Sequence, residues 1–526
     1  QPEDELYRVL ASLQNKEFLY EQPAFPEVEY IFKHALTQEV AYGTVLQERR
    51  KLLHEQTARA TEHLYHDHLE EHYGELAHHY SRGNNSEKAI EYLYKAGQQA
   101  GQRSATAEAI THLTTALELL KVRPDTPNAA QQELALQIAL GAPLIAAKGW
   151  AAPETVHVYT RARELCQQVG GDHQLFSVLV GLWFVYYARV EVQIAHDLSE
   201  QCLSLAGSRQ DPALLLEAHA IRGWNLYIPG EFVQAQEHFA QGLALYDSQQ
   251  HRSLASLYGG FDPGASCMAY TAYTLWLLGY PEQALKSIHA AVTLAQELVH
   301  PFSLAMALNW ATIAHQFRRE GQMVQERAEA AIALSIEQGF PFCVAWGTIL
   351  RGWALAEERQ REEGITQIRQ GIAAWQATGV EVWRPYFLAL LVEGHEKAEQ
   401  PEEGLRVLAE ALRAVEKTGE RWWEAELYRI KGELTLRSRV QGPKFQVEEE
   451  AEQCFHKAVA IARQQHAKSL ELRATMSLAR LWQSHGKTAE AHRMLSEIYH
   501  WFTEGFDTKD LQEAKALLQK LATNRE

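Results

Sequence analysis

Apolar residues recur along most of the chain at intervals of three and four positions, the spacing that places them on one face of an α-helix. The clearest unit, residues 215–247, reads as two helical segments joined at Gly230. Two helices can cross closely where small side chains meet, with one large side chain filling the groove beside them. The residues in these roles are Gly223, Ala235 and Gly242, with Phe239 as the large one.

The same pattern recurs along the chain with a mean spacing of about 40 residues. The positions that open each second helix are Ala89, Ala109, Thr155, Ala195, Ala235, Ala284, Arg327, Gly364, Gly404, Ala451 and Ala491. This small–large–small spacing resembles the tetratricopeptide family, with a longer period than that family's 34 residues. The resemblance implies an all-α fold, a right-handed superhelical solenoid in which about eleven hairpins over residues 71–505 stack on their neighbours.

Both ends of the chain depart from the repeat. Residues 506–526, with apolar positions between Leu511 and Leu521, predict a helix that caps the last hairpin. Residues 438–447 interrupt a unit and predict an exposed loop or hinge. Residues 1–70 lack the repeat and predict a short helix, a strand at Tyr30–Phe32 and one long helix over 37–65. That order resembles the C-terminal part of a winged-helix domain.

A more specific resemblance is carried by the run EYIFKHALTQEVAYGTVLQERRKLLHEQTARATEHLY at residues 29–65. It resembles the junction between ATPase and repeats in bacterial signal-transduction ATPases of the STAND class, many of which carry a class III adenylate or guanylate cyclase. KGWAAPE at 148–154, the run at 258–285 and EAELYRIKGELTL at 424–436 resemble the repeat region of the same family. The resemblance implies a sensor arm that controls ATPase or cyclase domains of the same polypeptide.

Catalytic motifs of those domains are missing from the sequence. It contains no GxxxxGK[ST] loop, the glycine-rich turn that cradles phosphates. The chain also begins without an initiator methionine, which suggests a fragment of a longer protein. We therefore expect no enzyme activity and no cofactor in this chain, with ATP and Mg²⁺ bound only in the missing domains.

Composition narrows the partners and the compartment. The formal net charge of −17 disfavours binding of nucleic acid by the repeats. No run approaches the roughly 18 apolar residues of a membrane span. The five cysteines are odd in number and show no CxxC spacing, which predicts buried free thiols in a cytoplasmic protein.

First helices of stacked hairpins line the concave side of a solenoid, so their side chains are candidates for a ligand or peptide groove. Trp, Tyr and Arg, which dominate binding hot spots, are frequent at the corresponding positions. Relative to Gly223 these are Trp224, Tyr227 and Ile228, and in other units Tyr186, Tyr273, Trp276, His315, Arg318, Arg319, Trp346, Trp353, Tyr386 and Arg429. The alternative interpretation is that most of them pack between neighbouring helices.

Two other constellations have structural explanations beside the functional ones. Seven histidines lie between His54 and His79, and His68 and His72 have the spacing of a metal-binding pair on a helix. Solvated or helix-capping histidines explain the same cluster. The glycine-rich loop at 259–264 looks like a phosphate cradle, but Asp262 as a helix N-cap followed by Pro263 explains it without a ligand.

Three classes of function remain open from the sequence. The first is a sensor and scaffold arm of a STAND-type ATPase or cyclase that binds a protein, peptide or small ligand on its concave surface. The second is the effector-binding domain of a winged-helix transcription regulator. The third is a metal-dependent enzyme built on the histidine cluster.

Overall fold

The computed structural model describes residues 3–23, 28–122, 127–170, 172–251, 253–438 and 444–523. The chain divides into two compact units, Gln1–Ala96 with Thr115–Val122, and Gly97–Thr114 with Arg123–Glu526. The predicted boundaries at residues 70 and 505 stay predictions. None of the helices in the described ranges combines the length and apolarity needed to cross a bilayer.

The first unit contains short helices and one antiparallel strand pair, in which Tyr20 lies opposite Ile31. Its elements are α1 (Glu3–Asn15), β1 (Leu19–Pro23), β2 (Val28–Phe32), α2 (Ala35–Thr44), α3 (Gln47–Leu64), the 3₁₀ helix η1 (Leu69–His72) and α4 (Tyr73–Arg82), with parts of α5 (Ser86–Gln102) and α6 (Thr106–Lys121). The strand predicted at Tyr30–Phe32 is confirmed. The single helix predicted over 37–65 is wrong, because extended backbone at Val45 and Leu46 separates α2 from α3. The winged-helix origin of this segment stays a prediction.

A carboxylate joins the helices that follow the strands. Glu62 of α3 accepts hydrogen bonds from the hydroxyls of Tyr80 on α4 and Tyr92 on α5, both at 2.5 Å, and from Lys88 Nζ at 3.0 Å. The Tyr80 and Tyr92 rings are stacked, with centroids 5.6 Å apart. This single acceptor therefore fixes α3 against the two helices after it.

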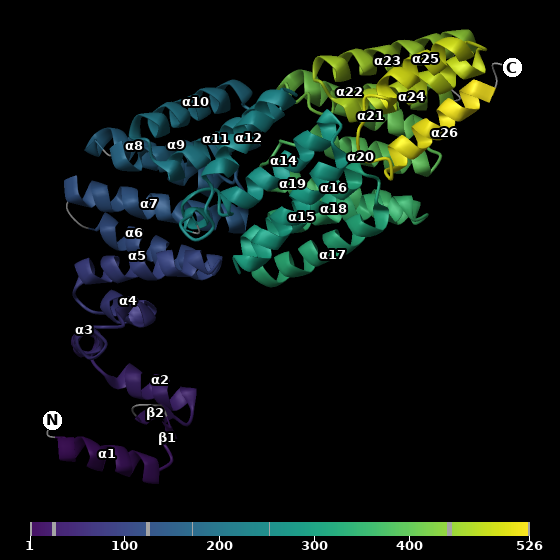
Figure 1. The fold of residues 1–526 in the computed structure, drawn as a ribbon. Helices are drawn as coiled ribbons and strands as arrows, with labels where there is room; N and C mark the ends of the chain where they lie inside the picture. The colour runs from purple at the N-terminus through teal and green to yellow at the C-terminus, as the bar shows by residue number, and fades with distance from the viewer. Residues whose placement is uncertain are drawn as a thin grey trace. The chain divides into compact units, whose positions relative to one another are not determined.

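The second unit is an array of antiparallel helical hairpins (Figure 1). Nine pairs follow one another between α7 and α25 in the described residues. The helices are α7 (Pro127–Lys148), α8 (Pro153–Val169), α9 (Asp172–Ala188), α10 (Val192–Arg209), α11 (Pro212–Tyr227), α12 (Phe232–Leu245), the short α13 (Leu254–Leu257), α14 (Pro263–Leu278), α15 (Pro281–Glu297), α16 (Pro301–Phe317), α17 (Gly321–Gln338), α18 (Pro341–Glu357), α19 (Arg361–Ala377), α20 (Arg384–Lys397), α21 (Pro401–Thr418), α22 (Glu424–Arg437), α23 (Lys444–Gln464), α24 (Lys468–Ser484), α25 (Thr488–Tyr499) and α26 (Lys509–Thr523).

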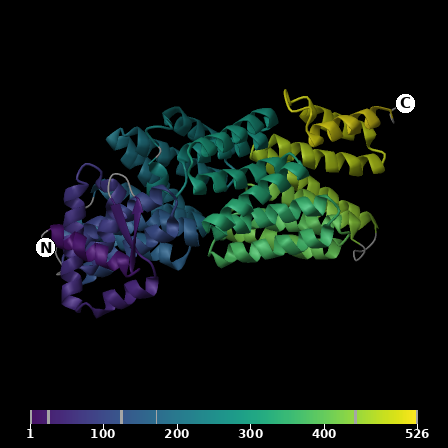
Figure 2. The same ribbon diagram turned by 90° about the horizontal axis from the view of Figure 1, so that it is seen from below.

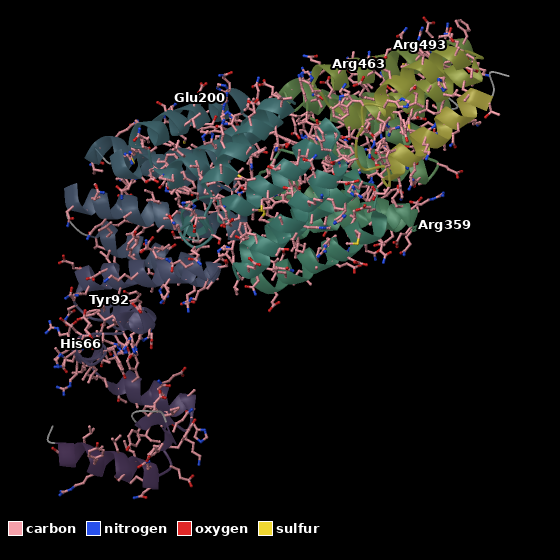
Figure 3. All side chains as sticks on the ribbon, in the orientation of Figure 1. His66, Tyr92, Glu200, Arg359, Arg463 and Arg493 are labelled. Atoms are coloured by element: carbon pink, nitrogen blue, oxygen red, sulfur yellow. The ribbon has the colours of Figure 1, made fainter. Side chains whose placement is uncertain are left out.

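First and second helices of the hairpins differ in burial. Nearly every residue of the first helix α16 is buried, whereas the second helices keep one polar face in solvent. Glu200 on α10 and Arg493 on α25 mark such outer faces in Figure 3. The first helices therefore form the inner layer of the array, and the stacking of the hairpins can be followed in Figure 2.

The predicted small–large contacts hold the hairpins together. A Cβ atom at Gly223 would overlap the ring of Phe239, and one at Gly432 would overlap the ring of Phe455. Because only glycine leaves room for the aromatic ring, the two helices of each hairpin approach more closely than side chains would otherwise allow. These contacts confirm a tetratricopeptide-like helical repeat, while the hand of its superhelix stays a prediction.

Local predictions outside the hairpin contacts have mixed outcomes. The N-cap role of Asp262 is confirmed, since its Oδ1 accepts a hydrogen bond of 2.8 Å from the amide of Ala265 at the start of α14. The five cysteines are free and buried, also as predicted. The predicted loop at 438–447 is wrong over residues 444–447, where α23 has already begun, and its residues 439–443 lie outside the described residues.

Successive turns of the inner layer touch each other at a fixed separation in sequence. Ser469 Oγ donates a hydrogen bond to the carbonyl of Trp276, 193 residues earlier. The amides of Glu381 and Arg421 donate to the carbonyls of Ala188 and Ile228 at the same separation. In each case the partner lies five hairpins back, so the loops before α20 and α22 and the start of α24 contact the ends of α9, α11 and α14.

The C-terminal helix continues this arrangement. Leu511, Ala514, Leu517 and Leu521 of α26 are buried in one cluster with apolar residues of α24 and α25. Arg318, at the end of α16, forms an ion pair of 3.5 Å with Asp507 just before α26. Helix α26 therefore covers the last hairpin and also contacts the end of α16, which begins the hairpin four units before that one.

Candidate ligand cavity on the inner helices

The aromatic residues predicted to line a groove lie inside the hydrophobic core. Their side chains are at most 3% exposed, which corrects the expectation that they form an open concave surface. This holds for Trp224, Tyr227, Tyr273, Trp276, Trp346, Trp353 and Tyr386, as well as for the neighbouring Ile228. Tyr186 is half-buried against the same core.

The reason is the contact between superhelical turns. The rings of Trp383 and Trp422, carried by the loops before α20 and α22, lie 6.0 and 5.2 Å from the ring of Tyr227 on α11. Side chains of one turn thus fill the space in front of the turn before it. The interior that a more open solenoid would leave as a groove is here a packed aromatic core.

Two of the predicted polar residues also have structural partners. His315 Nδ1 lies 2.6 Å from Glu320 Oε2, and Arg318 Nε donates to Glu320 Oε1 at 2.7 Å. Arg318 further donates to the carbonyl of Pro281 at 3.1 Å. Both side chains are buried, and they fix the turn after α16 rather than face solvent.

Three predicted residues do meet at a cavity, which has a volume of about 380 Å³. They are Arg319, Trp353 and Arg429, from the end of α16, from α18 and from α22. Helices α20, α24 and α26 complete its wall. Five first helices and the C-terminal helix α26, belonging to two successive turns of the superhelix, therefore surround one polar space.

Arg473 of α24 organises the deep side of the cavity. Its Nε donates to Asp510 Oδ2 at 2.8 Å, and its second terminal nitrogen donates to the carbonyl of Phe317 at 2.7 Å. The guanidinium lies 4.8 Å from the ring centre of Trp276. Asp510 also accepts from Arg319 at 3.2 Å. These contacts join α24, α26 and α16 through groups that are largely buried.

Glu426 and Arg429 form the second buried pair. Both Nε and Nη2 of Arg429 donate to Glu426 Oε1, at 3.0 and 2.9 Å. Burial raises the pKa of Glu426, but the guanidinium groups of Arg429 and Arg473 outweigh it and hold that pKa below its ordinary value. Glu426 is 2% exposed, and its Oε2 has no hydrogen-bond partner.

Glu393 of α20 carries the unusual carboxyl group of the cavity. Its Oε2 accepts a hydrogen bond of 2.7 Å from Trp353 Nε1. Burial raises its pKa to about 7, an effect that the neighbouring Glu426 and Glu357 reinforce. A carboxyl group with that pKa changes its charge near neutral pH.

Sequence reasoning missed Glu393, Glu426 and Arg473. Glu393 directly follows the apolar run FLALLV at 387–392, whereas Glu426 and Arg473 have other charged residues close to them in the sequence. That signal is visible in the sequence, but it identifies a buried charge and not its partners. The residues come together only because α20, α22 and α24 are adjacent first helices.

A second cavity, of about 300 Å³, lies beside the loop before α14 and is lined by Asp262, His300 and Ser303 among others. All three are already engaged in helix starts. Ser303 Oγ accepts from the amide of Asp262 at 2.9 Å, and His300 Nδ1 accepts from the amide of Ser303 at 3.2 Å. We therefore regard this cavity as a consequence of helix capping.

The histidine cluster of the first unit is only partly assembled. His54 Nδ1 lies 2.9 Å from His79 Nδ1, and its Nε2 lies 2.8 Å from the Tyr42 hydroxyl. His72 stacks on Tyr65 and contacts Glu75, and the 3₁₀ geometry of η1 gives it no helical i, i+4 relation to His68. In the part of the chain that the structure describes, no group of three His, Cys, Asp or Glu side chains is arranged to hold a metal ion.

Comparisons with known proteins extend this picture only at the level of the fold. No protein-family model matches the chain. A protein of Rhizobium meliloti, described as uncharacterized, is 25% identical over 455 residues, which are 86% of this chain and 43% of that protein. The chain therefore spans less than half the length of this relative.

Solved structures with a similar arrangement of helices include a Rap protein complexed with competence and sporulation factor, with 14% identity and a TM-score of 0.47 over 76% of this chain and 99% of that one. Yeast Tom70 is 14% identical with a TM-score of 0.37, over 83% and 96% of the two chains. A STAND protein with a tetratricopeptide repeat sensor from Pyrococcus horikoshii is 11% identical with a TM-score of 0.39, over 96% and 68%. None of these scores reaches 0.5, so the assignment of a tetratricopeptide-like repeat rests on the hairpins themselves.

Proposed function

We propose that this chain is the non-catalytic sensor and scaffold arm of a signal-transduction ATPase or nucleotide cyclase. In this proposal a protein segment, a peptide or a small molecule binds in the cavity on the inner helices. Binding of the ligand is then signalled to a switch domain of the same polypeptide, which binds ATP and Mg²⁺. The observation that carries the proposal is that one polar cavity is shared by five first helices and the C-terminal helix α26.

The position of the cavity supports a conformational signal. Its wall includes the end of α16 and helix α26, which belong to successive turns of the superhelix. A ligand that contacts both changes the free energy of the contact between the turns. It regulates only if its affinity differs between the closed and the loosened arrangement.

The first unit supports a connection to a further domain. Residues 29–65 carry the resemblance to the junction of STAND-class proteins. On and after α2, Leu36, Val40 and Leu46 are 70%, 60% and 81% exposed. Exposed apolar side chains grouped in this way are typical of surfaces that contact another protein domain.

The proposal can be tested with a variant that fills the cavity. Ser477 on α24 lines the cavity, is 3% exposed and donates a hydrogen bond to Glu433, so Ser477→Trp places an indole where a ligand would lie. Ser484→Trp, at an exposed position of the same helix, is the matched control. Native mass spectrometry of the chain purified from its host should detect a retained ligand in the control and none in Ser477→Trp. A ligand that is retained equally by both variants, or by neither of them nor the wild type, contradicts the proposal.

The regulated activity requires a second measurement on the parent polypeptide. Ser477→Trp should leave the basal rate of nucleotide turnover unchanged and remove its response to the ligand. If the parent shows no nucleotide turnover and instead carries a DNA-binding domain, the chain belongs to a transcription regulator.

A further inference from the structure

Almost every charged side chain around the cavity has an oppositely charged side chain beside it. Six cationic side chains line it, and each has a carboxylate within ion-pair distance. The shortest of these are 2.8 Å: Lys397 with Glu357, Arg437 with Glu396, Arg319 with Glu513 and Arg473 with Asp510. Incoming anions therefore find no unpaired cation in this wall.

Two acceptors remain unmatched. Among the seven acidic residues in the described wall, Glu393 is the one without a cationic partner, and its hydrogen bond from Trp353 is that of a neutral donor. Glu426 accepts the hydrogen bonds of Arg429 with Oε1 only, and no donor reaches its buried Oε2. A buried carboxylate oxygen without a donor costs stability, so such an atom marks a position that a donor of a ligand can occupy.

We propose that Glu393 and Glu426 form a recognition site for a primary ammonium group, so that the ligand of this cavity is a free amine or the lysine side chain of a peptide. This inference rests on the proposed function, because it names the chemical class of the ligand at the same cavity.

The geometry of the free oxygens favours an ammonium over a guanidinium group. A guanidinium binds best when both oxygens of one carboxylate accept its parallel N–H groups. Glu426 offers one oxygen, and Glu393 already uses Oε2 for the Trp353 indole. An ammonium group, with three donors directed apart, can instead contact single oxygens of two carboxylates.

Trp353 gives the site an apolar wall beside the two carboxylates. It is 2% exposed, lines the cavity, and its indole is held in place by the hydrogen bond to Glu393. The face of a tryptophan attracts a cation, and its surface also covers the methylene groups of an alkylamine. The space of about 380 Å³ is large enough for a chain of several methylene groups beyond the ammonium.

The experiment is isothermal titration of the 526-residue chain at pH 8 with four probes. Spermidine represents the free amines. Lysine amide acetylated at its α-nitrogen, with a free side-chain ammonium group, represents a peptide lysine. Pentylguanidinium and pentanol are the planar and the uncharged controls. At least one of the first two probes should bind. Both controls should bind with an affinity at least about tenfold lower. Which of the two ammonium probes binds more tightly identifies the source of the ligand.

Variants connect this binding to the two carboxyl groups. Glu393→Gln retains an oxygen for the Trp353 indole but removes the charge, and it should weaken the binding of the ammonium probe about tenfold or more. Glu399→Gln, whose side chain is 87% exposed beyond the end of α20, should leave it unchanged. Equal binding by Glu393→Gln and wild type, or tight binding of pentylguanidinium, overturns the ammonium site.

The outcome separates the two proposals. If neither ammonium probe binds while Ser477→Trp still abolishes retention of a natural ligand, the ammonium site is wrong and the cavity remains the binding site. If the ammonium probes bind and Ser477→Trp does not weaken them, they occupy another surface and both proposals fail.

Discussion

The backbone amide of Arg421 donates a hydrogen bond of 2.8 Å to the carbonyl oxygen of Ile228, which lies five hairpins earlier in the array. Trp422, the next residue, donates to the same oxygen at 3.1 Å. The end of α11 thus receives the loop before α22, and the side chain of Trp422 is fully buried behind it.

The first prediction concerns this contact between turns. Replacing Trp422 by Ala removes a buried ring and leaves a cavity, so it should lower the free energy of unfolding by about 3–5 kcal/mol. Phe445→Ala, at a position 63% exposed on α23, should change it by about 0.5 kcal/mol or less. Urea denaturation followed by circular dichroism measures both. A cost for Trp422→Ala no larger than that of the control would mean that the turns stack without stabilising each other.

The second prediction tests the close crossing within one hairpin. Gly223→Ala places a Cβ on the Phe239 ring and should destabilise the protein by about 1–3 kcal/mol. In Gly207→Ala on α10 the added Cβ meets no atom within 4 Å, so helix propensity should stabilise that variant by up to about 1 kcal/mol. Adding Phe239→Leu to Gly223→Ala should restore part of the loss. Thermal unfolding of the four proteins gives the comparison, and equal effects of the two alanines would contradict the crossing.

The third prediction is a pH dependence of stability from Glu420. This buried carboxyl accepts hydrogen bonds from the Trp383 amide and the Trp422 indole, and burial raises its pKa to about 8. The folded protein therefore binds this proton more tightly than the unfolded chain, in which Glu420 has a pKa of about 4.3. Its stabilising contribution is complete below that value and declines by about 1.4 kcal/mol per pH unit until the pH passes about 8.

Substitution separates this effect from other titrations. In Glu420→Gln the decline of the melting temperature between pH 5 and pH 8 should be smaller than in the wild type. Glu416→Gln, an exposed position on α21, should retain the full slope. Identical slopes in all three proteins would show that Glu420 does not titrate in this range.

The fourth prediction concerns ligand affinity and Glu393. Its carboxyl faces Glu426 from α22, Glu357 from α18 and Arg473 from α24, with the Trp353 indole bonded to it, and its pKa is raised to about 7 by burial. Below pH 7 the group is neutral and attracts an ammonium weakly. Affinity for the ammonium probe that binds more tightly should therefore rise about tenfold between pH 6 and pH 8 in the wild type, measured by titration calorimetry. Glu393→Gln should show a flat profile, and a pH-independent wild type would contradict the assignment.

The fifth prediction addresses the attachment of α26. Arg473→Met removes the guanidinium that donates to Asp510 and to the carbonyl of Phe317, leaving a buried carboxylate with less compensation. Such losses cost about 3–5 kcal/mol, so the amides of α26 should exchange with deuterium much faster. Arg463→Met, whose side chain is 52% exposed (Figure 3), should not change the exchange of α26. Unchanged exchange in Arg473→Met would assign the attachment to the apolar contacts alone.

Features that depend on nearby residues could be predicted from the sequence. The pairing of Gly223 with Phe239 lies within one hairpin, and the cap by Asp262 acts on the next three residues. In both cases the chemistry of a short segment determines the contact. The helical repeat followed from such local relations repeated along the chain.

Features that depend on the pitch of the superhelix could not be predicted from the sequence. Tyr227 lies on a first helix, but Trp383 and Trp422, more than 150 residues away in the sequence, bury it instead of leaving it on the predicted open surface. Nothing near Tyr227 in the sequence indicates those neighbours. The cavity has the same origin, because Glu393 of α20 and Glu426 of α22 share one wall only after these two first helices lie side by side.

The separation of 193 residues shared by three hydrogen bonds between the turns has a consequence for how this array can change in length. The loops before α20 and α22 and the start of α24 each fit the helix end five units behind them, as Trp422 does at Ile228. Insertion or loss of one whole hairpin in the middle would shift every later loop onto the wrong helix end. Hairpins can be added or removed at the ends without that mismatch, so the interior of this solenoid behaves as a single unit of fixed length.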